Sequence, residues 1–147
     1  MKFQLIIDKA KEEEVVITAH KQSSLTQQIE NLVMQHSGTD KLPAYLDDDI
    51  FLLSFSEIEC ITVLDGKTHA IDKTGKQYAL KQRLYEIESL LPGNFIRINK
   101  STIANENRIV RFAATFSGSV DAVFQCGYRE YVSRRCFADI KRRYEHL

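Results

Sequence analysis

The first part of the chain shows three segments in which apolar and polar positions follow a regular spacing. Residues 2–7 alternate between polar and apolar and then end in two isoleucines, and residues 12–19 begin with charges and continue into β-branched residues, so both are typical of strands. From Ser23 to Gln35, apolar residues recur at helical spacing, with a serine available as N-cap and a glycine beyond the end. The pattern predicts a small ββα unit.

A polar segment, residues 36–49, separates this unit from the rest of the chain. It has the Gly, Pro and Asp content of a linker. We therefore predict a domain boundary there, with residues 1–43 forming the N-terminal ββα unit and residues 44–147 forming a second domain.

The second domain is rich in short segments of β-branched and aromatic residues. Asp65-Gly66 is a strong signal for a short hairpin, and Gly75 marks a second turn. The predicted strands cover residues 50–55, 57–65, 95–98, 108–114, 119–124 and 128–132.

Two segments of this domain have a helical period instead. One runs from Leu80 to Leu91 and is stopped by a Pro-Gly pair, and the other begins after Ser133 as its N-cap. The predicted fold class is thus mainly β with short helices, preceded by the ββα unit. The candidate core consists of the apolar residues on these strands and helices: Phe51, Ile58, Ile61, Leu84, Leu91, Phe95, Ile109, Phe112 and Phe124.

The charge of the chain is unevenly distributed, although its net value is zero over 147 residues. Residues 1–60 carry five Lys/Arg and eleven Asp/Glu, whereas residues 61–147 carry fifteen Lys/Arg and nine Asp/Glu. An asymmetry of −6 against +6 is a hint that the second half binds a polyanion.

Other function classes lack a supporting motif in this sequence. No apolar run is long enough to span a bilayer, and no signal peptide is indicated, which predicts a cytoplasmic protein. The three cysteines lack C-x-x-C spacing and the four histidines lack ligand spacing, so we expect reduced thiols and no metal or other cofactor. No nucleophile motif is recognisable, and we expect a protein that is not an enzyme.

The basic residues of the second domain gather where predicted elements meet. Lys67 and His69 lie at the predicted hairpin, Lys100 follows a strand, and Arg134 and Arg135 follow the cap serine. Two cations in the first turn of a helix oppose its dipole and cost about 0.3–1 kcal/mol each when exposed. An anionic phosphate at that N-terminus would turn the cost into a gain. The alternative is an ordinary solvated face, which we expect for the arginines nearer the C-terminus.

The stretch NFIRINKSTIANENRIVRF, residues 94–112, places a polar, partly cationic segment between two apolar ones. Phe95, Ile98 and Ile103 are expected to anchor it in the core. A lysine at such a place predicts a loop that faces outward toward a ligand.

Four pieces of the second domain, in order and spacing, resemble a LytTR DNA-binding domain. They are an I-x-x-I strand beginning at Ile58, a helix with the sequence LYEIESLLP, the stretch FIRINKSTIANENRI, and YVSRRCFADIK near the C-terminus. The resemblance runs from Ile58 to Tyr144, which is more than half of the chain. One departure is Asn99-Lys100, where the family often has a histidine followed by asparagine or arginine.

The resemblance implies a mostly β fold of short stacked antiparallel sheets that binds double-stranded DNA through loops. It also implies a bacterial transcriptional regulator without an inserted recognition helix. The base-reading positions fall on His69, Lys100 and Arg134, of which the last two suit guanine O6 and N7 in a major groove. The residues then expected to bind phosphates are Lys67, Arg97, Asn99, Ser101, Ser133 and Arg135.

Residues 1–43 lie outside this resemblance. We expect them to mediate a homodimer on repeated DNA sites or to contact a regulatory protein partner. Two alternatives from other classes are a protein-interaction module with an incidental basic surface, and a small-molecule sensor with its ligand between the ββα unit and the sheets.

Overall fold

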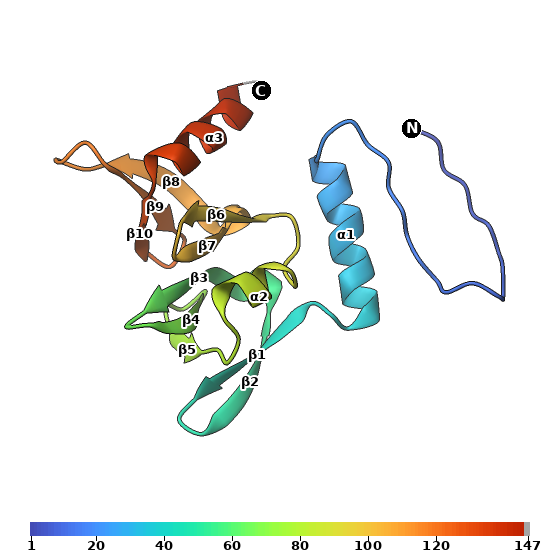
Figure 1. The fold of residues 1–147 in the computed structure, drawn as a ribbon, viewed down its shortest axis with the longest axis horizontal. Coiled ribbons are helices and arrows are strands. Elements are labelled where there is room, and N and C mark those ends of the chain that lie inside the picture. Colours follow the sequence, from blue (N-terminus) through green and yellow to red (C-terminus); the bar gives the residue numbers. More distant parts are fainter. Residues whose placement is uncertain (146–147) are drawn as a thin grey trace.

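The computed structural model of the protein describes residues 1–145, and its strands form two antiparallel sheets (Figure 1). The larger sheet has seven strands in the order β2-β1-β5-β4-β3-β7-β6, and the smaller has three in the order β10-β9-β8. The strands are β1 Lys41–Leu46, β2 Asp49–Ser54, β3 Ile58–Leu64, β4 Lys67–Asp72, β5 Gln77–Ala79, β6 Phe95–Asn99, β7 Thr102–Asn105, β8 Ile109–Ala114, β9 Val120–Phe124 and β10 Arg129–Val132. The helices are α1 Ser24–Ser37, α2 Leu84–Glu88 and α3 Arg134–Glu145.

The seven-stranded sheet is covered on both faces. Successive residues of its central strands point to opposite sides, so each strand contributes to two cores. Ile61 and Ile103 face a core that includes Leu84 and Ile87 of α2. Their neighbours Cys60 and Ala104 face a second core, which the smaller sheet and α3 close with the side chains of Ala122, Phe124, Val132 and Ile140. Figure 1 shows the smaller sheet and α3 at one end of the molecule and the β1–β2 hairpin at the other.

A buried ion pair joins the two sheets. Glu59 of β3 is fully buried, and its Oε1 accepts a hydrogen bond from Nε of Arg108, which lies just before β8. Its other oxygen, Oε2, accepts from the backbone N–H of Cys126 at 3.1 Å. Every oxygen of this carboxylate therefore has a donor from the second layer, which makes up for its removal from water.

The elements predicted for the second domain are present, with two differences. The polar stretch after Asn99 contains a strand of its own, β7, whose four residues are all buried. The helix predicted from Leu80 to Leu91 is shorter and spans only Leu84–Glu88 as α2. At Leu80 the chain still follows the sheet, since its N–H bonds to the carbonyl of Thr68 in β4.

Most of the candidate core is confirmed, but Phe51 is not part of it. Ile58, Ile61, Leu84 and Phe124 are buried, whereas Phe51 remains 38% exposed. It lies on β2, the edge strand of the sheet, where its ring meets Tyr78 edge to face at 5.2 Å between centroids. The partly buried candidates are Leu91, Phe95, Ile109 and Phe112.

The helix of the predicted ββα unit is present, but its two strands are not. Ser23 caps α1 with a reciprocal pair of hydrogen bonds to Thr26, and Gly38 ends the helix in the left-handed conformation. Within residues 1–145, the segments 2–7 and 12–19 are extended and exposed and have no strand partner. A strand needs another backbone to bond with, and these segments do not pair with each other or with the sheets.

The predicted linker also contains structure. Its residues 41–46 form β1, which pairs with β2 along its whole length, and Leu42 and Ala44 are buried in the first core. The domain division at residue 43 stays a prediction, yet a cut there would pass through β1. None of the helices in the described part of the chain has the length and apolar character needed to cross a bilayer.

A fragment of residues 40–147 is expected to fold without the preceding segment, because α1 has no buried residue. A fragment of residues 48–147 loses β1 and the burial of Leu42, and is expected to be less stable by at least about 2 kcal/mol. Urea unfolding followed by circular dichroism measures both free energies. Equal stabilities would show that β1 contributes nothing to the core.

Candidate nucleic-acid interface

Three segments that carry the predicted base-reading residues meet at one end of the seven-stranded sheet. The N–H of Val63, at the end of β3, bonds to the carbonyl of Ser101 in the β6–β7 turn at 3.0 Å. The N–H of Ser133, just before α3, bonds to the carbonyl of Ile98 in β6 at 2.8 Å. The β3–β4 turn, the β6–β7 turn and the start of α3 are thus held side by side, on the side of the molecule away from α1 (Figure 1).

His69 lies on strand β4 itself and not in the turn of the hairpin. It is paired across the sheet with Thr62, which in turn is paired with Thr102. The hydroxyl groups of the two threonines are 2.7 Å apart and buried. The imidazole Nδ1 lies 3.0 Å from the carbonyl oxygen of Lys67, and the ring is partly exposed. This row points to the face of the sheet that the smaller sheet and α3 cover.

Lys100 is at the tip of the β6–β7 turn. The turn is held by the side-chain oxygen of Asn99, which accepts from the N–H of Ser101 at 2.8 Å, and by Nη1 of Arg97, which donates to the carbonyl of Lys100 at 2.8 Å. The side chain of Lys100 is exposed and makes no hydrogen bond or ion pair within the described chain. The backbone of Lys100 is therefore held in place, while its ammonium group is free to reach a ligand.

Arg97 makes contacts within the protein that the sequence did not indicate. Its Nη2 forms an ion pair with Oε2 of Glu88 at 3.0 Å, and its Nε donates to the same oxygen at 3.3 Å. With Nη1 bonded to the turn, this guanidinium braces Lys100 against α2. Its phosphate-binding role stays a prediction, and it would require the contact with Glu88 to loosen.

Asn99 links the same turn to the smaller sheet. Its Nδ2 donates to the carbonyl of Tyr131 at 2.7 Å and to Oε1 of Glu130 at 3.4 Å. Glu130 also accepts from the hydroxyl of Tyr128 at 2.7 Å, and burial together with this bond raises the pKa of Tyr128. Both polar atoms of the Asn99 amide are in use inside the protein, so its role in binding phosphate also stays a prediction.

The start of α3 presents two arginines and two backbone donors. The Oγ of Ser133 accepts from the N–H of Cys136 at 3.2 Å, which is the bond of an N-cap. Arg134 and Arg135 are exposed, and neither their side chains nor their N–H groups form a bond within residues 1–145. Free amides and cations at a helix N-terminus suit an anion.

Four cations at this end of the molecule have no carboxylate partner within the described chain. Elsewhere in the second domain, Arg108, Arg129, Arg142 and Arg143 each pair with a carboxylate. At the candidate interface, Arg97 pairs with Glu88, but four other cations form no ion pair among the described residues: Lys67, Lys100, Arg134 and Arg135. Other cations of the second domain, such as Lys76 and Arg111, also form no ion pair within residues 1–145, so the distinctive feature of these four is that they lie on three segments held together.

Several residues that shape the site were missed from the sequence. Glu59, Glu88 and Tyr131 set the positions of the predicted ones through the contacts described above. Glu59 had a signal, since it is a charged residue between Ile58 and Cys60 in a continuous apolar strand, a place that calls for a buried partner. Among residues 1–145, no three His, Cys, Asp or Glu side chains gather as they would around a metal ion.

Comparison with known proteins places this geometry in a family. The sequence model of the LytTr DNA-binding domain family matches residues 48–145. The fold is similar to the LytTr DNA-binding domain of a Bacillus cereus response regulator, with a TM-score of 0.63 and 24% identity over 70% of this chain and 94% of that one. The chain therefore belongs to the LytTr DNA-binding domain family, which confirms the resemblance and the mainly β fold class drawn from the sequence.

Two full-length relatives extend the similarity to the N-terminal segment. They are HTH-type transcriptional regulators of Staphylococcus aureus strains MSSA476 and NCTC 8325, each 34% identical over 145 residues and covered to 97% in both chains. A helix-turn-helix needs two successive helices joined by a short turn. In the described chain, α1 and α2 are separated by five strands, and so are α2 and α3.

Proposed function

We propose that this protein is a sequence-specific transcriptional regulator that binds double-stranded DNA with the end of the seven-stranded sheet. The observation that carries the proposal is the meeting of the β3–β4 turn, the β6–β7 turn and the start of α3, which present four cations without carboxylate partners. Membership of the LytTr DNA-binding domain family supports it, as do the relatives named as transcriptional regulators.

Phosphates give this interface its affinity and position. The free amides at the start of α3 and the side chains of Lys67 and Arg135 suit the DNA backbone, with Ser133 able to donate its hydroxyl proton while its oxygen caps the helix. Charged contacts of this kind carry no sequence information by themselves.

Base reading falls to the three side chains that project from fixed backbone. Arg134 projects from the first turn of α3, Lys100 projects from the β6–β7 turn that Arg97 holds, and His69 projects from β4. Arginine and lysine suit guanine O6 and N7 in the major groove. Because these residues come from turns and a helix end, we propose contact through loops and no inserted recognition helix. We further propose a non-enzymatic role in the cytoplasm, where bacterial DNA lies.

Binding to DNA is expected to weaken steeply with salt. If about five phosphates are neutralised, log K against log salt has a slope of about −4 to −5. A duplex selected from a random pool, labelled for fluorescence anisotropy and titrated at several salt concentrations, measures this slope. A slope near zero would refute the DNA-binding proposal and favour a protein-interaction module or a sensor.

A pair of variants on α3 sharpens this measurement. Arg135→Ala removes a free cation and is expected to reduce the slope by roughly one unit. Arg143→Ala is the matched control on the same helix, because Arg143 already pairs with Glu106 at 3.2 Å and lies near the other end. Equal slopes for both variants would remove Arg135 from the interface.

A further inference from the structure

The N-terminal surface, defined here as residues 1–37, exposes more apolar side chain than a solitary domain normally does. Phe3 is 90% exposed, Ile7 is 82% exposed and Val16 is 75% exposed. On α1, Leu25, Leu32 and Val33 are also exposed, and the helix has no buried residue. Large apolar patches of this kind mark a surface that another molecule covers.

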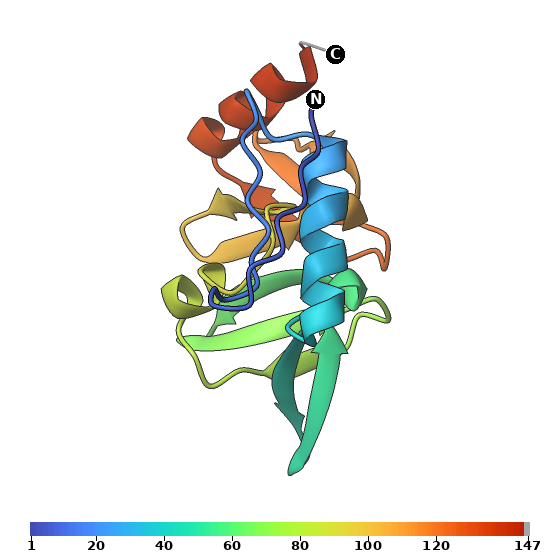
Figure 2. The same ribbon diagram turned by 90° about the vertical axis from the view of Figure 1, so that its right-hand side faces the viewer.

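The backbone of this surface is unpaired as well. Within residues 1–22 of the described chain, the backbone forms a single bond to other backbone, from the N–H of Lys11 to the carbonyl of Asp8. The segments on either side of this bend, 2–7 and 12–19, run as two extended arms beside α1 (Figures 1 and 2). Their residues have the β-branched and alternating character of strands. These segments therefore favour the strand conformation, and what they lack is a second strand to pair with.

The total surface area of the protein also indicates that another molecule covers part of its surface. The protein exposes 10755 Å², whereas a compact monomer of 16.9 kDa is expected to expose about 7,700 Å². The excess is roughly 3,000 Å², and a stable interface takes only about 800 Å² from each partner. The N-terminal surface is thus large enough to supply an interface.

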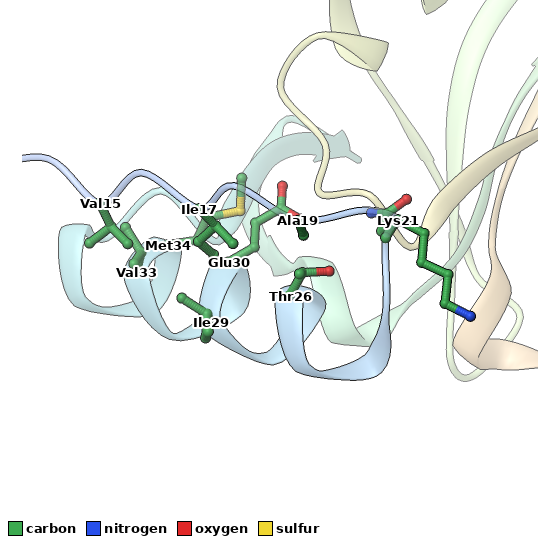
Figure 3. A pocket seen from close by; sticks show the side chains of 10 residues that line it. Val15, Ile17, Ala19, Lys21, Thr26, Ile29, Glu30, Val33 and Met34 are labelled. Carbon is green, nitrogen blue, oxygen red and sulfur yellow. The ribbon is translucent and has the colours of Figure 1, made fainter. Parts of the chain in front are cut away.

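The N-terminal surface contains a groove, which lies between residues 12–19 and α1. It has a volume of about 530 Å³, and Val15 and Ile17 lie on one side of it with Ile29, Val33 and Met34 on the other (Figure 3). The groove is open and mainly apolar. It suits the side chains of an added strand.

The charges of the N-terminal surface permit a second copy as its partner and disfavour a membrane. Residues 1–37 carry four lysines and five Asp/Glu, so two copies do not repel each other strongly. A membrane surface would require an excess of Lys/Arg, which this segment lacks. In a two-fold interface the same patch serves both subunits, and a segment such as 2–7 can pair antiparallel with itself.

We propose that the N-terminal surface is the dimerisation surface of this protein, and that a second copy of the chain covers it. Residues 2–7 and 12–19 pair as strands with those of the other copy, and the apolar side chains of the two copies cover both α1 helices and fill both grooves. The dimer forms without DNA and carries two candidate DNA interfaces, each on the side of its subunit away from α1.

Sedimentation equilibrium of the full-length protein without DNA tests this proposal. The wild-type protein is expected to be a dimer, and Ile6→Asp and Val33→Asp should each raise the dimer dissociation constant at least about 30-fold. Phe116→Asp is the matched control, because Phe116 is fully exposed in the β8–β9 turn, far along the chain from the N-terminal surface. It is expected to leave the constant unchanged.

Hydrogen exchange gives a second, independent readout. The amides of residues 2–7 and 12–19 have no backbone partner in a single chain, so they should exchange freely at low protein concentration and become protected as the dimer forms. A wild-type protein that stays monomeric into the millimolar range would overturn the proposal. So would a dimer that both N-terminal variants leave unchanged, or a dimer whose N-terminal amides remain unprotected. Each of these outcomes would leave the DNA-binding proposal intact.

Discussion

Replacement of Arg134 by alanine is expected to weaken binding to the preferred DNA site by about 1–3 kcal/mol and to weaken binding to random DNA much less. Arg134 directly follows the cap serine, and its exposed side chain has no partner within the described chain. It can therefore extend from the helix start to a base while the backbone amides beside it meet a phosphate. Specificity should be lost at a single base pair.

The control for this experiment lies on the same helix. Arg142 forms an exposed ion pair with Asp139, and Arg142→Ala is expected to change the binding free energy by less than about 0.5 kcal/mol on either DNA. Competition binding with the selected duplex and with mixed-sequence DNA measures both variants. If Arg134→Ala loses the same free energy on both, Arg134 binds only phosphate, and base reading falls to Lys100, His69 or Arg135.

Arg97 provides a contrast within the same interface. The structure has Arg97 bonded to Glu88 and to the carbonyl of Lys100, so it supports the turn that presents Lys100. An alanine at this position acts on affinity through the turn as well as through any phosphate contact. Arg134 is thus the cleaner test of base reading.

Glu59→Ala is expected to destabilise the protein by about 3–5 kcal/mol, the largest effect we predict for a single substitution. The change removes a fully buried carboxylate and leaves the guanidinium of Arg108 and the N–H of Cys126 without their acceptor. Urea unfolding measures the loss. DNA binding should weaken too, because this carboxylate holds the sheet of His69 and Lys100 against the layer that carries Arg134.

A nearby glutamate serves as the control for Glu59. Glu57 forms an ion pair with Lys73 at 3.2 Å, but both side chains are about half exposed. Glu57→Ala is therefore expected to cost less than about 1 kcal/mol. Equal costs for the two substitutions would mean that the buried pair contributes no more than an exposed one.

Local patterns were sufficient for most elements of the second domain. The strands around Ile61 and Phe124, the hairpin at Asp65-Gly66 and the cap at Ser133 all rest on residues close in sequence, and the structure contains each of them. The candidate cations were also readable, since they stand at junctions between elements. Their grouping at one end of the sheet agrees with the family resemblance, although their roles on DNA stay predictions.

Contacts between distant residues were beyond such patterns. Asn99 finds its acceptor on Tyr131, 32 residues away, and Glu59 finds Arg108 across 49 residues. Nothing in the neighbourhood of Arg97 indicated that Glu88 would take its guanidinium. These contacts depend on strand order and register, and only the assembled sheets decide them.

The preferences of the chain for strands, turns and helices are readable along the sequence, because they are set by each residue and its near neighbours. By this measure the N-terminal segments 2–7 and 12–19 favour strands, although neither forms one in the structure. Whether such a segment becomes a strand depends on a second backbone within hydrogen-bonding reach. The tertiary structure supplied that backbone for β1 and β7, where the sequence predicted a linker and a loop. It supplied none for residues 1–22.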